Sequence, residues 1–190
     1  MRKILMFNRV TLNGYFAGPQ GEIDWFIHDP EVDRVLHASM DADTMLLGRV
    51  TYQLFAAYWP YVLSNPEASA GDRVLAQELN QMTKVVFSTT IQRVTWENTL
   101  LLQDNLVEEA RKMKEGEGGD IVIFGSGTVV KQLSDAGLID EHLIVVTPVI
   151  LESGMPLFKD VRREELKLID ARGFDTGNVL LHYRVVHPGS

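Results

Sequence analysis

Residues 120–133 read Asp-Ile-Val-Ile-Phe-Gly-Ser-Gly-Thr-Val-Val-Lys-Gln-Leu and join an apolar run, a small-residue turn and a helical pattern. The run at 121–124 predicts a buried strand, and the spacing after it predicts an amphipathic helix. The turn between them consists of Gly125, Ser126, Gly127 and Thr128. Glycine lets the backbone approach a ligand closely, and the first N–H groups of a helix attract anions. The stretch predicts either a phosphate-binding turn or a tight turn closed by a Ser or Thr N-cap.

The same turn excludes several well-known sites. Its spacing differs from the G-x-x-x-x-G-K-[ST] of a P-loop and from the G-x-G-x-x-G of a Rossmann turn. Phe124 stands where a hydrolase nucleophile elbow, G-x-S-x-G, requires glycine. Ser126 is therefore predicted to make hydrogen bonds and not to act as a nucleophile.

Composition limits the class of protein. A chain of 190 residues with 45% hydrophobic residues predicts a single domain over 1–190. The net charge of −8 argues against nucleic-acid and membrane partners. The absence of cysteine excludes disulfides and thiol chemistry and favours a reducing cytoplasm, and the five histidines show no metal-binding spacing. The N-terminal residues are expected to form a strand and not a signal peptide.

Strand and helix patterns alternate along the chain until a terminal hairpin. The expected strands are 3–10, 44–47, 84–87, 100–102, 121–124, 141–146, 166–175 and 178–186. The expected helices are 30–40, 50–57, 72–82, 105–114 and 128–136, with loops at 12–21 and 59–60. This order predicts an α/β fold in which helices cover both faces of a mostly parallel sheet that has an antiparallel edge.

Polar or small residues follow three of these strands, at 47–51, 87–90 and 124–128. Ligands of open parallel sheets bind beyond the carboxyl ends of the strands. The first junction offers a glycine and the cation Arg49 to a phosphate. The second offers hydroxyls to a ribose or a 2′-phosphate, and the third offers a helix N-terminus to a pyrophosphate. Together they predict one dinucleotide site.

With these junctions, the whole chain resembles the dihydrofolate reductase-like superfamily. It is most similar to the bacterial branch related to the reductase domain of the bifunctional riboflavin-biosynthesis deaminase/reductase. The resemblance rests on Thr-Leu-Asn-Gly-Tyr-Phe-Ala at 11–17, Leu-Gly-Arg-Val-Thr-Tyr at 47–52, Phe-Ser-Thr-Thr at 87–90 and Phe-Gly-Ser-Gly at 124–127. It implies a three-layer α/β/α fold with a mixed, mostly parallel sheet of about eight strands and a C-terminal antiparallel hairpin.

The resemblance also implies an NADPH site. The residues that would hold the cofactor phosphates are Gly48, Arg49 and Thr51. The residues near the adenosine end would be Ser88 and Thr89. Those at the pyrophosphate and nicotinamide would be Gly125, Ser126, Gly127 and Thr128, and those in the mobile loop over the nicotinamide would be Ala17 and Gly18.

Hydride transfer needs a positioned substrate and, in many cases, a proton donor. The predicted acid is Asp24, and the other carboxylates weighed are Asp29, Glu31 and Asp33. Asp29 precedes Pro30 and is expected to cap a helix. The predicted substrate contacts are Asn13, Tyr15 and Trp25. Asn13 stands where the family loop often carries Asp, so its amide is expected to hydrogen-bond and not to act as an acid.

The function predicted is an NADPH-dependent reductase of a small heterocycle, of pteridine or pyrimidine type. The resemblance further implies a homodimer that could form through the C-terminal hairpin. Two alternatives stay open. One is a non-catalytic nucleotide-binding or regulatory protein on the same fold, and the other is a flavin-binding, flavodoxin-like protein.

Overall fold

The computed structural model describes residues 1–186, whose main element is an eight-stranded sheet. Its strands are β1 (Ile4–Thr11), β3 (Ala42–Gly48), β4 (Thr83–Phe87), β5 (Thr99–Leu102), β6 (Asp120–Phe124), β7 (Glu141–Thr147), β9 (Leu166–Gly173) and β10 (Val179–Val185). Their order is β5-β4-β3-β6-β1-β7-β10-β9. The pairs from β5 to β7 are parallel, and those of β10 with β7 and β9 are antiparallel. The predicted mixed sheet with a terminal hairpin is confirmed.

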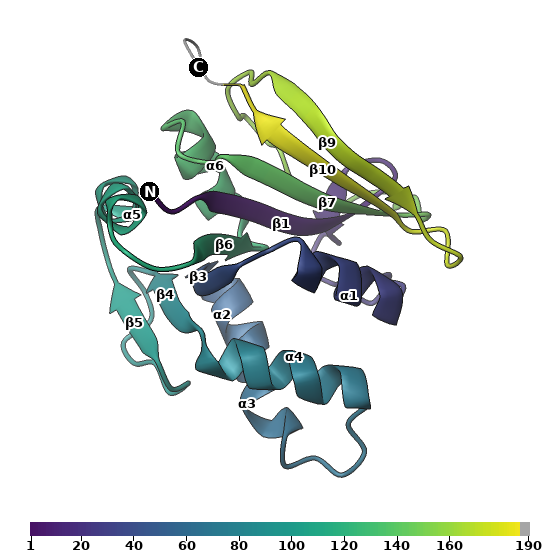
Figure 1. The fold of residues 1–190 in the computed structure, drawn as a ribbon, viewed down its shortest axis with the longest axis horizontal. Helices are drawn as coiled ribbons and strands as arrows, with labels where there is room; N and C mark the ends of the chain where they lie inside the picture. The colour runs from purple at the N-terminus through teal and green to yellow at the C-terminus, as the bar shows by residue number, and fades with distance from the viewer. Residues whose placement is uncertain (187–190) are drawn as a thin grey trace.

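Helices cover both faces of this sheet, as predicted (Figure 1). They are α1 (Pro30–Ala38), α2 (Arg49–Ala56), α3 (Trp59–Val62), α4 (Ala70–Gln81), α5 (Leu106–Glu115) and α6 (Gly127–Asp135). Figure 1 shows α1, α2 and α4 on one side of the sheet and α5 and α6 on the other. No helix within residues 1–186 is long and apolar enough to cross a lipid bilayer.

Alternation along β1 divides the core between the two faces. Ile4 and Met6 pack in the cluster that includes α5 and α6 residues, whereas Leu5 packs with α1 residues. Phe7 continues the α1 side. A strand without a polar face must be covered twice, because successive side chains point in opposite directions. The same alternation directs the next odd-numbered residue, Arg9, to the α1 side.

The parallel register brings the three junctions together. β3 lies between β4 and β6, and Gly48 at the end of β3 is opposite Phe87 at the end of β4. Leu46 of β3 is likewise opposite Ile123 of β6. The carboxyl ends of these neighbouring strands therefore meet at one edge of the sheet, as the sequence predicted.

Two segments expected to be loops contain short regular elements. Tyr15–Ala17 forms β2, which pairs with β8 (Met155–Pro156) in a separate two-stranded sheet. The expected loop at 59–60 instead begins α3. Both corrections have the same physical reason: elements of two to four residues carry no hydrophobic period, and β2 depends on a partner far away in the sequence.

β9 is the outer strand of the hairpin, and all eight of its residues are exposed. Its large apolar side chains Leu166, Leu168 and Ile169 are among them. An open, partly apolar edge strand can pair with another chain. The homodimer implied by the resemblance stays a prediction, because these features belong to one chain.

Lys84 lies fully buried at the beginning of β4. Its ammonium donates to the carbonyl oxygens of Leu79 at 3.1 Å and Asn80 at 2.9 Å, near the end of α4. It also lies 4.5 Å from the centre of the Trp96 ring. Burial lowers the pKa of Lys84 to about 8, against the opposing charge of Glu97. The ammonium thus joins α4 to the sheet at the cost of its own hydration.

This burial predicts how stability changes at alkaline pH. The pKa of Lys84 is about 8 in the folded chain, against 10.5 for a lysine in water, so the folded state releases its proton first. The free energy of unfolding should therefore rise between these pH values, relative to Lys84→Met, by at most about 3 kcal/mol. Urea unfolding of both proteins across this pH range measures the effect. A difference in the free energy of unfolding between the two proteins that does not change with pH would contradict this prediction.

Candidate functional site

A cavity of about 1580 Å³ opens at the edge where β3, β4 and β6 end. Ten of the residues that line it were predicted to bind a cofactor: Ala17, Gly48, Arg49, Thr51, Ser88, Thr89, Gly125, Ser126, Gly127 and Thr128. Residues of all three junctions therefore line one cavity.

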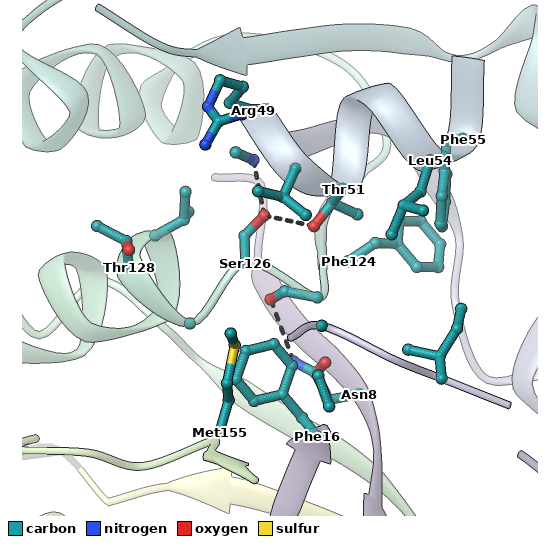
Figure 2. A pocket seen from close by; sticks show the side chains of 18 of the residues that line it. Asn8, Phe16, Arg49, Thr51, Leu54, Phe55, Phe124, Ser126, Thr128 and Met155 are labelled. Atoms are coloured by element: carbon teal, nitrogen blue, oxygen red, sulfur yellow. Dashed lines mark hydrogen bonds between the residues drawn. The ribbon is translucent and has the colours of Figure 1, made fainter. Parts of the chain in front are cut away.

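The hydroxyl of Ser126 connects two of the junctions (Figure 2). Ser126 Oγ accepts a hydrogen bond from the backbone N–H of Gly48 at 2.7 Å and lies 2.9 Å from Thr51 Oγ1. Ser126 has a φ of +53°, a conformation that few residues other than glycine adopt. This strained backbone directs the side chain away from its own helix and toward α2. Ser126 therefore makes hydrogen bonds, as predicted, and its partners are groups of the protein itself.

The first turns of α2 and α6 have no side-chain caps. Gly48 precedes α2 and cannot provide one, and Ser126 precedes α6 but makes no capping hydrogen bond. The N-capped turn considered from sequence is therefore wrong for this stretch. The first N–H groups of both helices lack intrahelical partners and carry partial positive charge. The N-terminal residues of both helices line one cavity, and their first N–H groups can attract an anion.

Two glycines permit the close approach of these turns. Gly125 has a φ of +57°, and a Cβ there would lie 2.8 Å from Thr51 Oγ1. Its carbonyl oxygen accepts a hydrogen bond from Asn8 Nδ2 at 3.2 Å. A Cβ at Gly127 would lie 3.3 Å from the Phe16 ring. Side chains at these positions would close the space beside the helix N-terminus.

The remaining junction is held by its own serine. Ser88 Oγ accepts from the N–H groups of Thr90 at 3.2 Å and Ile91 at 3.0 Å. Thr89 is exposed at the cavity wall, and Arg49 is also exposed, with Nη1 3.2 Å from Gln53 Oε1. Ser88 therefore shapes the turn, while Thr89 and Arg49 are available to a ligand.

The structure does not bring the other predicted residues into the cavity lining. Asn13 joins two loops, because its amide donates to Leu151 O at 2.8 Å and its oxygen accepts from Thr11 Oγ1 at 2.9 Å. Tyr15 pairs with Pro156 in the small sheet. Three more predicted residues lie outside the cavity lining: Gly18, Asp24 and Trp25.

These last three residues belong to the loop before α1. The N–H of Gly18 donates to Glu22 O at 2.8 Å, and Trp25 Nε1 donates to the same oxygen at 3.2 Å. Asp24 is exposed to solvent. Among the other carboxylates weighed, Asp29 caps α1 as expected and accepts from the Thr176 hydroxyl, which lowers the pKa of Asp29. The structure provides no reason to place the reacting proton on Asp24.

Sequence reasoning missed Arg9, which lines the same cavity together with Asp33, one of the carboxylates weighed from the sequence. Arg9 of β1 and Asp33 of α1 form an ion pair, with Nη2 2.7 Å from Oδ1. Burial lowers the pKa of Arg9, and the charge of Asp33 opposes this. The available signal was a single arginine within the apolar run of β1. Beside the pair, Phe7 and Phe124 meet edge to face, with ring centres 5.7 Å apart.

The described residues provide no cluster of metal ligands. Within residues 1–186, no group of three or more His, Cys, Asp or Glu side chains could hold a metal ion. The cavity instead combines backbone N–H groups, hydroxyls and one exposed arginine with an aromatic wall. Such an arrangement suits an organic ligand with phosphate groups at one end and a flat ring at the other.

Substitution of Gly125 tests the close approach of the two junctions. Gly125→Ala should lower the free energy of unfolding by about 2–4 kcal/mol, from backbone strain and overpacking against Thr51. Gly14→Ala is the control, because Gly14 has a φ of +86° but a Cβ there would have no atom within 4 Å. Gly14→Ala should lower the free energy of unfolding by about 1–2 kcal/mol, from backbone strain alone.

Denaturant unfolding measures both variants. Adding Thr51→Ala to Gly125→Ala should recover part of the loss, because the methyl group then has room. If both glycine variants lost the same free energy of unfolding, or if Thr51→Ala recovered none of it, Gly125 would not be in close contact with Thr51.

Comparison with known proteins identifies the family and the fold of the chain. The model of the RibD C-terminal domain family matches residues 2–180. The uncharacterized protein YyaP of Bacillus subtilis (strain 168) is 33% identical over 183 residues, 96% of this chain and 94% of YyaP. The crystal structure of a putative riboflavin biosynthesis protein from Shewanella sp. PV-4 superposes with a TM-score of 0.74 at 20% identity, covering 97% of this chain and 99% of that one.

Dihydrofolate reductase from Enterococcus faecalis, in a complex with NADP(H), has the same fold. It superposes with a TM-score of 0.66 at 17% identity, and the match covers 97% of each chain. At such identities the two structures establish the fold alone. The family model covers nearly the whole chain, so the protein belongs to the RibD C-terminal domain family and has its dihydrofolate reductase-like fold.

Proposed function

We propose that this protein is an NADPH-dependent reductase that transfers a hydride to a small heterocyclic substrate. One observation carries the proposal: the Ser126 hydroxyl holds the uncapped N-termini of α2 and α6 at the edge of a single cavity. Each helix N-terminus can bind one phosphate group. A dinucleotide with an additional phosphate carries enough phosphate groups to occupy both helix N-termini. The solved relatives with this fold include one in a complex with NADP(H).

The residues of the cavity fit such a cofactor. In the proposed complex, the N–H groups of Gly127 and Thr128 bind the pyrophosphate, because no side chain caps them. Arg49 and the first turn of α2 bind a further phosphate, and Thr89 lies at the adenosine end. Gly125 leaves room beside the turn that a side chain would fill.

The chain's contribution to the reaction is mainly positioning. The bound nicotinamide would supply the hydride. Phe7, Phe124 and Phe55 provide an aromatic wall, with Phe55 and Phe124 ring centres 5.6 Å apart, on which a flat substrate can lie. Phe16 and Met155 border the α6 turn from the small sheet (Figure 2). Both groups limit the access of water to the reacting carbon.

A second candidate is a non-catalytic protein that binds NADPH through the same residues. The exposure of Asp24 favours it, because the predicted proton donor lies outside the cavity lining. Hydride transfer nonetheless does not require a protein acid when water can protonate the substrate. For either candidate we propose the cytoplasm as the compartment, in keeping with a chain that has no cysteine.

Turnover separates these candidates. The protein is mixed with NADPH and a panel of dihydropterins and pyrimidines, and oxidation of the nicotinamide is followed by its absorbance. Oxidation that depends on one of these compounds supports the reductase. Tight NADPH binding without oxidation across the panel supports the non-catalytic protein, and binding of FMN in preference to both nicotinamide cofactors contradicts both.

Arg49→Met should weaken NADPH binding by about tenfold or more, because a charge-assisted contact to phosphate is lost. The dependence of affinity on salt should fall as well. Fluorescence titration of the tryptophans measures both quantities. Arg163→Met is the matched control, since the Arg163 side chain is 89% exposed and outside the cavity lining. Equal affinities for the two variants would remove Arg49 from the site.

A further inference from the structure

A second cavity, of about 390 Å³, lies between α1 and α4. Both helices lie on the same side of the sheet (Figure 1). The lining residues of α4 include Leu75, Glu78 and Leu79, whose spacing of three and four residues places them on one helix face. Among the described residues, none of those assigned to the cofactor lines this cavity. Its volume lies in the range of about 300–1,000 Å³ that is typical of small-molecule sites.

The inner surface of this second cavity is apolar. Phe7, Val122 and Phe124 of the sheet line it, and the methionines Met40 and Met82 line it beside the two helices. The rings of Phe7 and Phe124 also line the large cavity, so the two spaces adjoin at these rings. Apolar side chains around an unfilled space lose van der Waals contacts. A ligand with an apolar body would restore these contacts.

The polar part of the lining is acidic. Four carboxylates contribute to it: Asp33, Asp41, Asp43 and Glu78. Arg9 pairs with Asp33, and Arg2 pairs with Asp43, so two of these charges are already compensated. Within residues 1–186, no lysine or arginine lines the cavity or forms an ion pair with Asp41 or Glu78. The uncompensated charge therefore favours a cation and repels phosphate and carboxylate groups.

His37 spans the gap between the two helices. Its Nδ1 lies 3.1 Å from Glu78 Oε2, and its side chain is 64% exposed. A neutral imidazole can donate one hydrogen bond to Glu78 but leaves the negative charge of the carboxylate in place. Because the ring is exposed and turns on flexible bonds, it can move aside for a ligand that brings a full positive charge.

We propose that this second cavity binds a small hydrophobic monocation, an ammonium group on an aryl or alkyl body. The apolar body lies against Phe7 and Phe124, and the ammonium group lies near Glu78 and Asp41. The inference concerns a different space from the cofactor site and does not depend on the proposed reductase function. No reaction is assigned to the bound cation.

Three probes with a phenyl ring and a similar alkyl chain test the charge requirement: 4-phenylbutylamine, 4-phenylbutan-1-ol and 4-phenylbutyrate. Methionine methyl groups labelled with ¹³C report where each probe binds in NMR titrations. Met40 and Met82 line the second cavity, whereas Met155 lines the large one. Met→Leu variants assign the three signals.

The amine should shift the signals of Met40 and Met82, with a dissociation constant of about 1 mM, as expected for a ligand of this size. The alcohol should bind about threefold more weakly, because it makes no ion pair. The butyrate should bind more weakly still. Raising the salt concentration should reduce the preference for the amine.

Variants test the acidic side chains. Glu78→Gln keeps the shape of the side chain and should weaken amine binding about two- to fivefold, while binding of the alcohol stays unchanged. Adding Asp41→Asn should reduce the preference further. Glu108→Gln is the matched control, because it makes the same change in net charge at an exposed position of α5, on the other side of the sheet. Glu108→Gln should bind the amine as the wild-type protein does.

Several outcomes would overturn the assignment. They are a shift of the Met155 signal without those of Met40 and Met82, equal binding of amine and alcohol, an equal loss in Glu78→Gln and Glu108→Gln, and no shift at all. The same titrations in saturating NADPH separate this inference from the proposed function. A protein that binds the amine beside Met40 and Met82 but fails to bind NADPH supports this site and contradicts the reductase proposal alone.

Discussion

The hydrogen bonds of one hydroxyl hold the site together. Ser126 Oγ, at the end of β6, accepts from the N–H of Gly48 at the end of β3 and contacts Thr51 in the first turn of α2. The αL backbone of Ser126 and the missing side chain of Gly125 make this contact possible. Because the hydroxyl is used in this way, it does not cap α6. The same interaction therefore joins two strands, fixes two helices and leaves both helix N-termini open to anions.

The sheet order makes this interaction possible and also separates two environments. Parallel β4, β3 and β6 gather backbone donors and hydroxyls at one end of the cavity. β1 follows β6 and contributes Arg9, which pairs with Asp33 of α1 and also lines the cavity. Open parallel sheets bind their ligands in this way, beyond the carboxyl ends of the strands.

Most of the fold could be predicted from the sequence because its signals are local. Apolar runs, Pro30 at a helix start and glycines at strand ends mark elements within a few residues. The pairing of β2 with β8 and the helix α3 could not be predicted, because neither has a period of its own. Among site residues, those at strand ends were predicted from their junctions, and Asp33 was weighed as a carboxylate. Arg9 was missed, because it meets Asp33 only through the side-chain alternation of β1. Asp24 was chosen because Asp24-Trp25 resembles a dipeptide common in the family, and such a local resemblance does not determine that the side chain is exposed.

Hydrogen–deuterium exchange of the backbone amides, with and without NADPH, tests the central claim most directly. If Ser126 holds one dinucleotide site, NADPH should slow exchange together in residues 48–51 and 126–129, because both helix N-termini bind phosphate. The remote hairpin of β9 and β10 should be unaffected. Protection of one segment without the other, or of neither in a protein saturated with NADPH, would contradict the account.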